Sequence, residues 1–116
     1  MINSCQKGKR VERELRDVLR EAGYSSAERG QQRAGSPDSP DVRCKELPAL
    51  HFECKGVQNL SIWPTMAKAV EDAGPDQMPV VAHKKNGTKF LVTMRIEDWL
   101  TLIRQVFPPQ PTEGAA

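Results

Sequence analysis

The segment 40–55 constrains the fold of this chain more than any other part of it. Its residues predict two short strands joined by a tight turn at Leu47-Pro48-Ala49. If the strands pair about this turn, Asp41 lies opposite Lys55 and Arg43 lies opposite Glu53. Directly opposed residues share one face of a sheet. The segment therefore predicts a β-hairpin with charged residues facing one another across it.

The two faces of this predicted hairpin differ in chemistry. Side chains alternate along a strand with period two, so His51, Glu53 and Lys55 lie on the same face as Asp41. The other face is apolar and carries Val42, Cys44, Leu50, Phe52 and Cys54. We therefore expect two carboxylates and an amine together on a polar face. We expect His51, which has no obvious partner there, to support this group or to face solvent.

Two interpretations of the polar face stay open from the residues alone. Two neighbouring carboxylates suit a hard cation such as Mg2+, which is usually held by one or two carboxylates together with waters and phosphates. A lysine beside such an ion can stabilise the charge that builds on a phosphate under attack. The alternative is a solvated face on which acids and bases pair as surface salt bridges, which stabilise a fold little.

The order Pro-Asp, strand, Glu-x-Lys resembles the signature of the PD-(D/E)xK nuclease superfamily. The matching residues are Pro40-Asp41 and Glu53-Cys54-Lys55. The resemblance implies a restriction-endonuclease-like α/β fold. It also implies that Asp41, Glu53 and the backbone carbonyl of Cys54 hold Mg2+, for which Mn2+ substitutes. Lys55 would then take part in catalysis.

The N-terminal segment 7–22 predicts an amphipathic helix. Its apolar residues recur with helical spacing at Val11, Leu15, Val18, Leu19 and Ala22. The first turns are basic, and a cluster of this kind can contact phosphates. The cluster consists of Lys7, Lys9, Arg10 and Arg13. The alternative is a solvated face with ion pairs between residues four apart.

The segment 7–15 also resembles the opening helix of archaeal-type Holliday junction resolvases, a branch of the same superfamily. The resemblance implies that Glu12, at the border of the apolar stripe, joins the metal site. It implies further that the basic residues beside it, Lys9 and Arg10, bind DNA.

The loop before Asp41 has the Gly, Gln, Ser and Pro content of irregular structure. It resembles the mobile loop that precedes the Pro-Asp motif in the family, in which Arg29, Arg33 and Ser36 would touch the DNA backbone. A plain connector is the alternative. The loop also contains a second Pro-Asp pair, so Asp38 is the other candidate for the motif aspartate. We favour Asp41 because it directly precedes a predicted strand.

The second half of the chain predicts a helix at 64–73 and then a β-hairpin. Lys68 stands where many relatives have a glutamine near the metal site, and it either adds a cation for the scissile phosphate or is not used. The runs 79–83 and 90–94 predict strands, and Asn86-Gly87 predicts the turn between them. Lysines surround this turn and either protect an edge strand or contact DNA: Lys84, Lys85 and Lys89.

Length and composition set the class of protein. A chain of 116 residues, 38% hydrophobic and 28% charged, predicts one domain at 1–107 followed by a disordered Pro-rich tail at 108–116. No apolar run approaches the ~20 residues that span a bilayer, so no membrane partner is expected. The net charge of +2 permits a polyanionic partner without requiring one. Three cysteines without CxxC spacing predict reduced thiols in a cytoplasm and disfavour zinc.

The predicted order of elements is α-β-β-β-α-β-β-α, a mixed sheet flanked by helices, which is also the order in the resolvase branch. We expect a Mg2+-dependent endonuclease that resolves four-way DNA junctions by paired nicks in DNA recombination and repair. Alternatives are a repair or restriction-type nuclease with the same site, and a DNA-binding module without catalysis. A junction has approximate two-fold symmetry, so we expect a homodimer. The interface candidates are Trp63, Met66 and a closing helix at 96–103.

Overall fold

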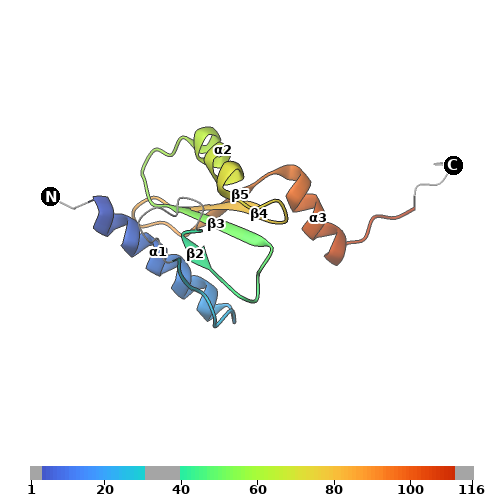
Figure 1. Ribbon diagram of the computed structural model, residues 1–116, viewed down its shortest axis with the longest axis horizontal. Helices are drawn as coiled ribbons and strands as arrows, with labels where there is room; N and C mark the ends of the chain where they lie inside the picture. Colours follow the sequence, from blue (N-terminus) through green and yellow to red (C-terminus); the bar gives the residue numbers. More distant parts are fainter. Residues whose placement is uncertain (1–3, 31–39, 112–116) are drawn as a thin grey trace.

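The computed structural model describes residues 4–30 and 40–111, with side chains from position 7 onward (Figure 1). The elements follow the order α1 (Ser4–Glu21), β1 (Glu28–Arg29), β2 (Val42–Arg43), β3 (Leu50–Lys55), α2 (Ile62–Asp72), β4 (Met78–His83), β5 (Leu91–Met94) and α3 (Ile96–Val106). The prediction of an α/β fold with a mixed sheet flanked by helices is confirmed. Among the described helices, none is long and apolar enough to cross a membrane.

The five strands form one sheet in the order β1-β2-β3-β4-β5. The pairs β1–β2, β2–β3 and β4–β5 are antiparallel, whereas β3 and β4 run parallel from the Leu50–Met78 pair to the Lys55–His83 pair. Parallel strands need a crossover connection, and α2 supplies it. The chain therefore places its longest strands, β3 and β4, side by side at the centre of the sheet.

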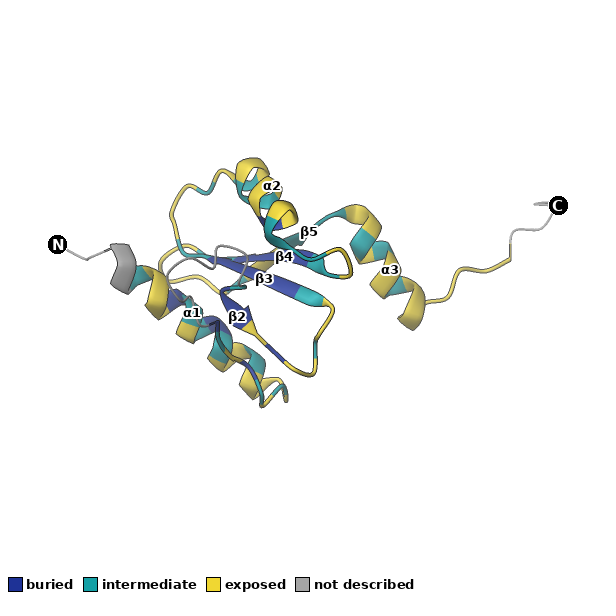
Figure 2. Ribbon diagram, viewed as in Figure 1, coloured by how far each residue is buried: buried dark blue, intermediate teal, exposed yellow. Residues whose placement is uncertain are grey.

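Helices cover the central strands from both sides (Figures 1 and 2). On one face, α1 buries Val11 and Leu15 against Val42, Phe52, Cys54, Val80 and Ala82. On the other face, α2 packs against β4 and β3, and its Ala69 is fully buried. Figure 2 shows the buried residues concentrated along β3 and β4. Strands that are covered on both faces cannot expose an alternating polar face to water.

The polar face expected on β3 is consequently not a solvated one. His51, Glu53 and Asp41 are 0%, 5% and 7% exposed. This burial contradicts the interpretation of a solvent-exposed set of surface salt bridges, and it contradicts a solvent-facing His51. The physical reason is the parallel partner β4, which makes β3 a central strand covered by α2.

The register of the first hairpin differs from the predicted one. Val42 pairs with Phe52. The predicted register, with Asp41 opposite Lys55, would pair Val42 two residues further along β3, so that prediction is wrong.

The cause lies in the connection between β2 and β3. A single tight turn was expected, but the chain makes two consecutive turns. Leu47 N–H donates to the carbonyl of Cys44 at 3.0 Å, and Leu50 N–H donates to the carbonyl of Leu47 at 3.1 Å. The longer connection shifts the pairing, so the predicted match of Arg43 with Glu53 is also wrong.

The second hairpin forms as predicted. β4 and β5 pair from Val80–Met94 to His83–Leu91. Gly87 in the connecting turn has φ 75°, a left-handed conformation that glycine adopts without steric cost. The expected Asn86-Gly87 turn is therefore confirmed, within a connection longer than two residues.

The last helix differs most from its expected role. The pattern at 96–103 predicts a closing helix, but within the described part of the chain α3 buries none of its residues. Figure 1 shows it projecting away from the sheet. Ile96 and Trp99 remain 67% and 45% exposed. Of the predicted tail, residues 108–111 are exposed without regular structure, and 112–116 lie outside the described residues.

Gly56 provides a test of how α1 packs against the end of β3. A Cβ at this position would collide with Cγ2 of the buried Val11 and lie 3.2 Å from its Cγ1. We expect Gly56→Ala to destabilise the fold by about 1–3 kcal/mol, the usual cost of overpacking. Gly8→Ala is the matched control, because a Cβ there meets nothing within 4 Å among the described atoms. Inside a helix it should stabilise by about 0.5–1 kcal/mol.

Thermal unfolding of the two variants beside the parent chain measures both effects. An unchanged midpoint for Gly56→Ala would contradict the close approach of α1 to the end of β3.

Candidate active site

Asp41 is fixed at the start of β2 by the backbone of β3. Its Oδ2 accepts a hydrogen bond from the N–H of Cys54 at 2.8 Å, and its own N–H donates to the carbonyl of Phe52 at 2.9 Å. Its carbonyl also accepts from the N–H of Gly30 at 2.9 Å. These contacts hold the buried carboxylate of Asp41 beside the middle of β3, where Glu53 projects.

Glu53 lies between two lysines. The Nζ atoms of Lys55 and Lys68 are each 4.0 Å from its Oε1. The Glu53 side chain is 7% exposed, whereas those of Lys55 and Lys68 are 40% and 60% exposed. The ammonium groups therefore face outward over a buried carboxylate. Lys68 lies beside Glu53 from its position on α2.

Asp72 holds Lys68 in place. Lys68 donates to its Oδ2 at 3.1 Å, one turn further along α2. This hydrogen bond, followed by the charge of Glu53, raises the pKa of Lys68. The interaction was not anticipated, although the spacing of four residues on a predicted helix was visible in the sequence.

Glu12 reaches the site from α1. Its Oε1 accepts a hydrogen bond from Nε of Arg29 at 3.0 Å, and both side chains are largely covered. Glu12 also interacts electrostatically with Asp41. The structure thus brings Glu12 to the other acids. It places Arg29 against Glu12, an ion pair that links α1 to β1 and that no local pattern indicates.

Burial raises the pKa of all three acids. For Glu12 the loss of water outweighs the opposing hydrogen bond from Arg29. For Asp41 it outweighs the hydrogen bond from Cys54, and for Glu53 the negative charge of Asp41 adds to it. Neighbouring carboxylates in a poorly solvated site stay ionised at a cost, which a proton or a cation relieves.

His51 is buried beside these acids. It is fully covered, and neither ring nitrogen has a hydrogen-bond partner among the described residues. It pairs in register with Pro79, which has no N–H to offer. His51 also interacts electrostatically with Asp41. The expected supporting position is consistent with this placement.

The remaining predicted DNA contacts lie on α1 or outside the described residues. Lys9, Arg10 and Arg13 are exposed, and Lys7 is half-buried. Arg10 approaches Glu14 at 3.7 Å, an i,i+4 pair that matches the solvated alternative. Three further predicted residues fall within 31–39, outside the described part of the chain: Arg33, Ser36 and Asp38.

The chemistry of these acids fits a hard cation. Among the described residues, no group of three His, Cys, Asp or Glu side chains is close enough to hold a metal ion. Mg2+, however, needs only one or two carboxylates when waters and phosphates complete its shell. Asp41 and Glu53 are two such oxygen donors with raised pKa values. They and the backbone carbonyl of Cys54 are therefore a donor set that suits Mg2+.

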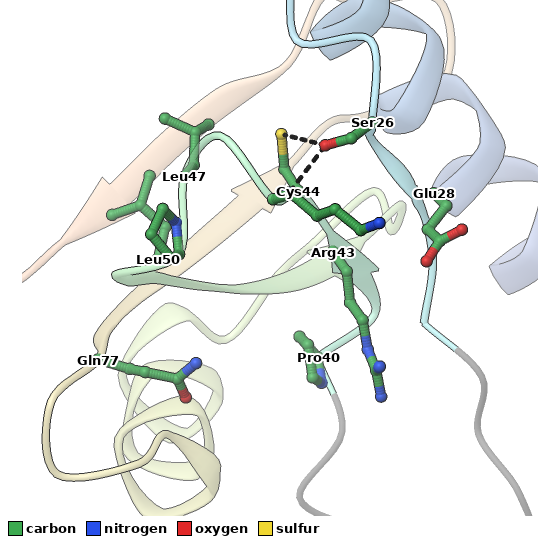
Figure 3. A pocket seen from close by; sticks show the side chains of 10 residues that line it. Ser26, Glu28, Pro40, Arg43, Cys44, Leu47, Leu50 and Gln77 are labelled. Atoms are coloured by element: carbon green, nitrogen blue, oxygen red, sulfur yellow. Dashed lines mark hydrogen bonds between the residues drawn. The ribbon is translucent and has the colours of Figure 1, made fainter.

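A pocket lies where β3 and β4 begin, and its polar contacts join neighbouring segments of the chain (Figure 3). It measures about 380 Å³ and includes Ser26 and Cys44 in its lining. The Ser26 hydroxyl hydrogen-bonds Glu46, and the Cys44 thiol donates to the same carboxylate at 3.1 Å. These bonds lower the pKa of Glu46 to about 2. The cluster ties the segment before β1 to the turns between β2 and β3.

Comparisons with family models, with curated proteins and with solved structures find no match to this chain. Within this geometry, Glu12 and Glu53 each interact electrostatically with Asp41, and Lys55 lies 4.0 Å from Glu53.

The raised pKa values predict how stability depends on pH. Between the ordinary and the raised pKa of Asp41 and Glu53, the folded protein binds more protons than the unfolded chain, so stability falls as pH rises through that window. Asp41→Asn removes one of two repelling charges. We expect it to raise the free energy of unfolding at pH 7 by about 1 kcal/mol, or roughly 4–8 °C in Tm.

Thermal unfolding from pH 4 to pH 8 without divalent ions measures this gain, which should shrink as the pH falls. Asp17→Asn is the control, because Asp17 is exposed on α1. It should change stability by less than about 0.5 kcal/mol. A gain for Asp41→Asn that does not vary with pH would contradict its electrostatic origin.

Proposed function

We propose that this chain is a metal-dependent DNA endonuclease of the PD-(D/E)xK type that acts on four-way junctions. The observation that carries the proposal is the pair of buried carboxylates, Asp41 and Glu53, with raised pKa values beneath the ammonium groups of Lys55 and Lys68. Perturbed acids beside specific charged partners are typical of functional sites. The order of the elements and the motif residues support the restriction-endonuclease-like assignment.

Asp41, Glu53 and the backbone carbonyl of Cys54 would hold Mg2+ or Mn2+, with Glu12 alongside. When bound, the ion supplies Lewis-acid polarisation of a phosphoryl oxygen. An all-oxygen donor set favours these ions over zinc. Arg29 keeps Glu12 oriented through its hydrogen bond, so the acid on α1 stays directed to the strands.

The two lysines perform the steps that this chain itself supplies. The Lys55 ammonium is anchored near Glu53 yet is exposed enough to donate hydrogen bonds to a phosphate oxygen and to orient an attacking water. Lys68 adds a second positive charge, kept protonated by Asp72. Fixed charges that face the developing negative charge lower the barrier most, because they need no reorganisation during the reaction.

Phosphate contacts around the site come from α1 and from the loop before β2. The basic residues of the first turns of α1 flank Glu12 and are mostly exposed. They are Lys7, Lys9, Arg10 and Arg13. Arg29 lies at the same border, and Arg33 and Ser36 belong to the proposal through the resemblance alone.

Cleavage of a four-way junction with Mg2+ tests the site. We expect Asp41→Asn to abolish cutting while junction binding persists, and Lys55→Ala to slow cutting by about 10²–10³-fold, the cost of losing one preorganised donor. Lys45→Ala, in the exposed turn after β2, is the matched control and should cut normally.

The substrate panel separates the alternatives. Equal cutting of plain duplex would favour a repair or restriction-type nuclease, and binding without cutting in Mg2+ or Mn2+ would favour an inactive DNA-binding module. Full activity of Asp41→Asn would move the motif role to Asp38 or end the proposal.

We also propose a symmetric homodimer, because two paired nicks need two sites. Trp63 is 84% exposed, and α3 presents Ile96 and Trp99 without covering them. An isolated helix of 11 residues is marginal in water, so α3 gains stability from a partner. Apolar surface of this kind is typical of an interface.

Sedimentation at micromolar concentration checks the assembly. We expect a dimer for the parent chain and a shift to monomer for Trp99→Glu. Gln105→Glu, also exposed on α3, is the matched control and should leave the dimer intact. A parent chain that sediments as a monomer yet cuts junctions in pairs would contradict the dimer.

A further inference from the structure

A cavity of about 910 Å³ opens just beyond the end of β3. One wall is the segment 57–62 that leads into α2, and the other is the hairpin of β4 and β5. Its volume is in the range of ligand-binding cavities, about 300–1,000 Å³. Its lining includes Val57, Gln58, Lys84, Lys85, Lys89 and Leu91.

One hydrogen bond joins the two walls. The N–H of Asn86, at the tip of the hairpin, donates to Oε1 of Gln58 at 3.0 Å. Within the hairpin, the side chains of His83 and Thr93 are joined at 2.9 Å. These two bonds connect the tip of the hairpin to the segment 57–62 and join β4 to β5.

The lining has the chemistry of a site for an anionic chain with apolar parts. Among the described residues that line it, three are lysines and none is acidic. Leu91 and Val57 leave 66% and 41% of their surface uncovered. Amides and hydroxyls complete the lining and can form hydrogen bonds. Grooves that bind single-stranded nucleic acids combine positive charge with side chains on which bases stack, usually aromatic ones. In this cavity the exposed apolar side chains are aliphatic.

The three lysines of this cavity differ in whether an acidic side chain already pairs with them. Lys84 donates to Glu14 on α1 at 2.7 Å and lies 5.6 Å from the ring centre of Phe90. Lys85 and Lys89 are exposed, and no ion pair engages them among the described residues. A bound phosphate would therefore meet these two lysines first.

The hairpin wall of the cavity begins beside Lys55, at the end of β3. The N–H of Lys84 donates to the carbonyl of Lys55 at 3.0 Å, and His83 pairs with Lys55 in register. Lys55 of the candidate site and the start of this cavity are therefore neighbours.

We propose that this cavity binds an unpaired stretch of DNA strand next to the scissile phosphate, an inference that rests on the proposed nuclease function. Lys85 and Lys89 contact its phosphates, and Leu91 and Val57 contact its bases. In a duplex the base faces are stacked on one another, so they cannot contact Leu91 and Val57. An unpaired strand offers both phosphates and base faces.

Fluorescence anisotropy with a labelled 12-nucleotide oligothymidine tests this proposal on the full chain in EDTA, where no cutting occurs. We expect the double variant Lys85→Ala/Lys89→Ala to bind about 25-fold more weakly at 0.1 M salt, since each lost single-strand contact removes about 0.7 from the salt slope. Leu91→Ala should weaken oligothymidine binding and leave duplex binding unchanged. Unfolding midpoints near that of the parent chain establish that these exposed substitutions leave the fold intact.

Arg43→Ala/Lys45→Ala is the matched control, because it removes two exposed charges at the opposite end of β3 and β4. It should bind oligothymidine as the parent chain does. Equal weakening by both double variants would overturn the proposal. So would a loss of duplex binding as large as the loss of oligothymidine binding, or no effect of Leu91→Ala.

Two further probes separate other occupants. Tighter binding of oligouridine or of a polyglutamate peptide than of oligothymidine would overturn the assignment to DNA. Failure of the proposed function looks different, because it appears as intact oligothymidine binding in EDTA with no cutting of any DNA in Mg2+ or Mn2+.

Discussion

The burial of β3 on both faces is the constraint from which the rest of the structure follows. β3 lies between an antiparallel neighbour and a parallel one, with α1 on one face and α2 on the other. Only one of its faces can be filled by apolar side chains from this strand, so the other carries His51 and Glu53 into a dry environment. Removing a carboxylate from water costs free energy unless charges or hydrogen bonds compensate. The two lysines above Glu53 and the backbone N–H beneath Asp41 provide part of that compensation.

What could be predicted from the sequence was local. The spacing of Val11 and Leu15 identified α1, and Asn86-Gly87 identified the second hairpin, because both depend on residues close in the chain. The register of the first hairpin could not be derived, because two successive turns between Cys44 and Leu50 are as compatible with those residues as one tight turn. The parallel pairing of β3 with β4 was equally inaccessible, since it joins strands separated by a whole helix. The mistaken solvated face followed directly from missing that pairing.

The candidate site shows the same difference between local patterns, which the sequence predicts, and contacts between distant segments, which it does not. Glu12, Asp41, Glu53 and Lys55 were named from a motif, and in the structure Asp41 interacts electrostatically with both glutamates while Lys55 lies near Glu53. Contacts that join distant segments had no sequence signal. The bond from Arg29 to Glu12 spans 17 residues, and that from Lys84 to Glu14 spans 70. Both bonds connect α1 to the sheet side of the fold. Glu12 and Glu14 therefore help to hold the helix in place, in addition to any role in the candidate site.

These contacts explain why the acids can be held together at all. Arg29 and Lys84 neutralise the acids of α1 from the side, whereas Lys55 and Lys68 approach Glu53 only to 4.0 Å, beyond hydrogen-bond distance. The compensation of Glu53 by these lysines is therefore incomplete, and its pKa stays raised. A fold selected for stability alone would pair Glu53 fully or replace it with an apolar residue, which is often neutral or favourable. A buried carboxylate whose lysines stop beyond hydrogen-bond distance keeps electrostatic attraction in reserve, and the cation proposed above would use it.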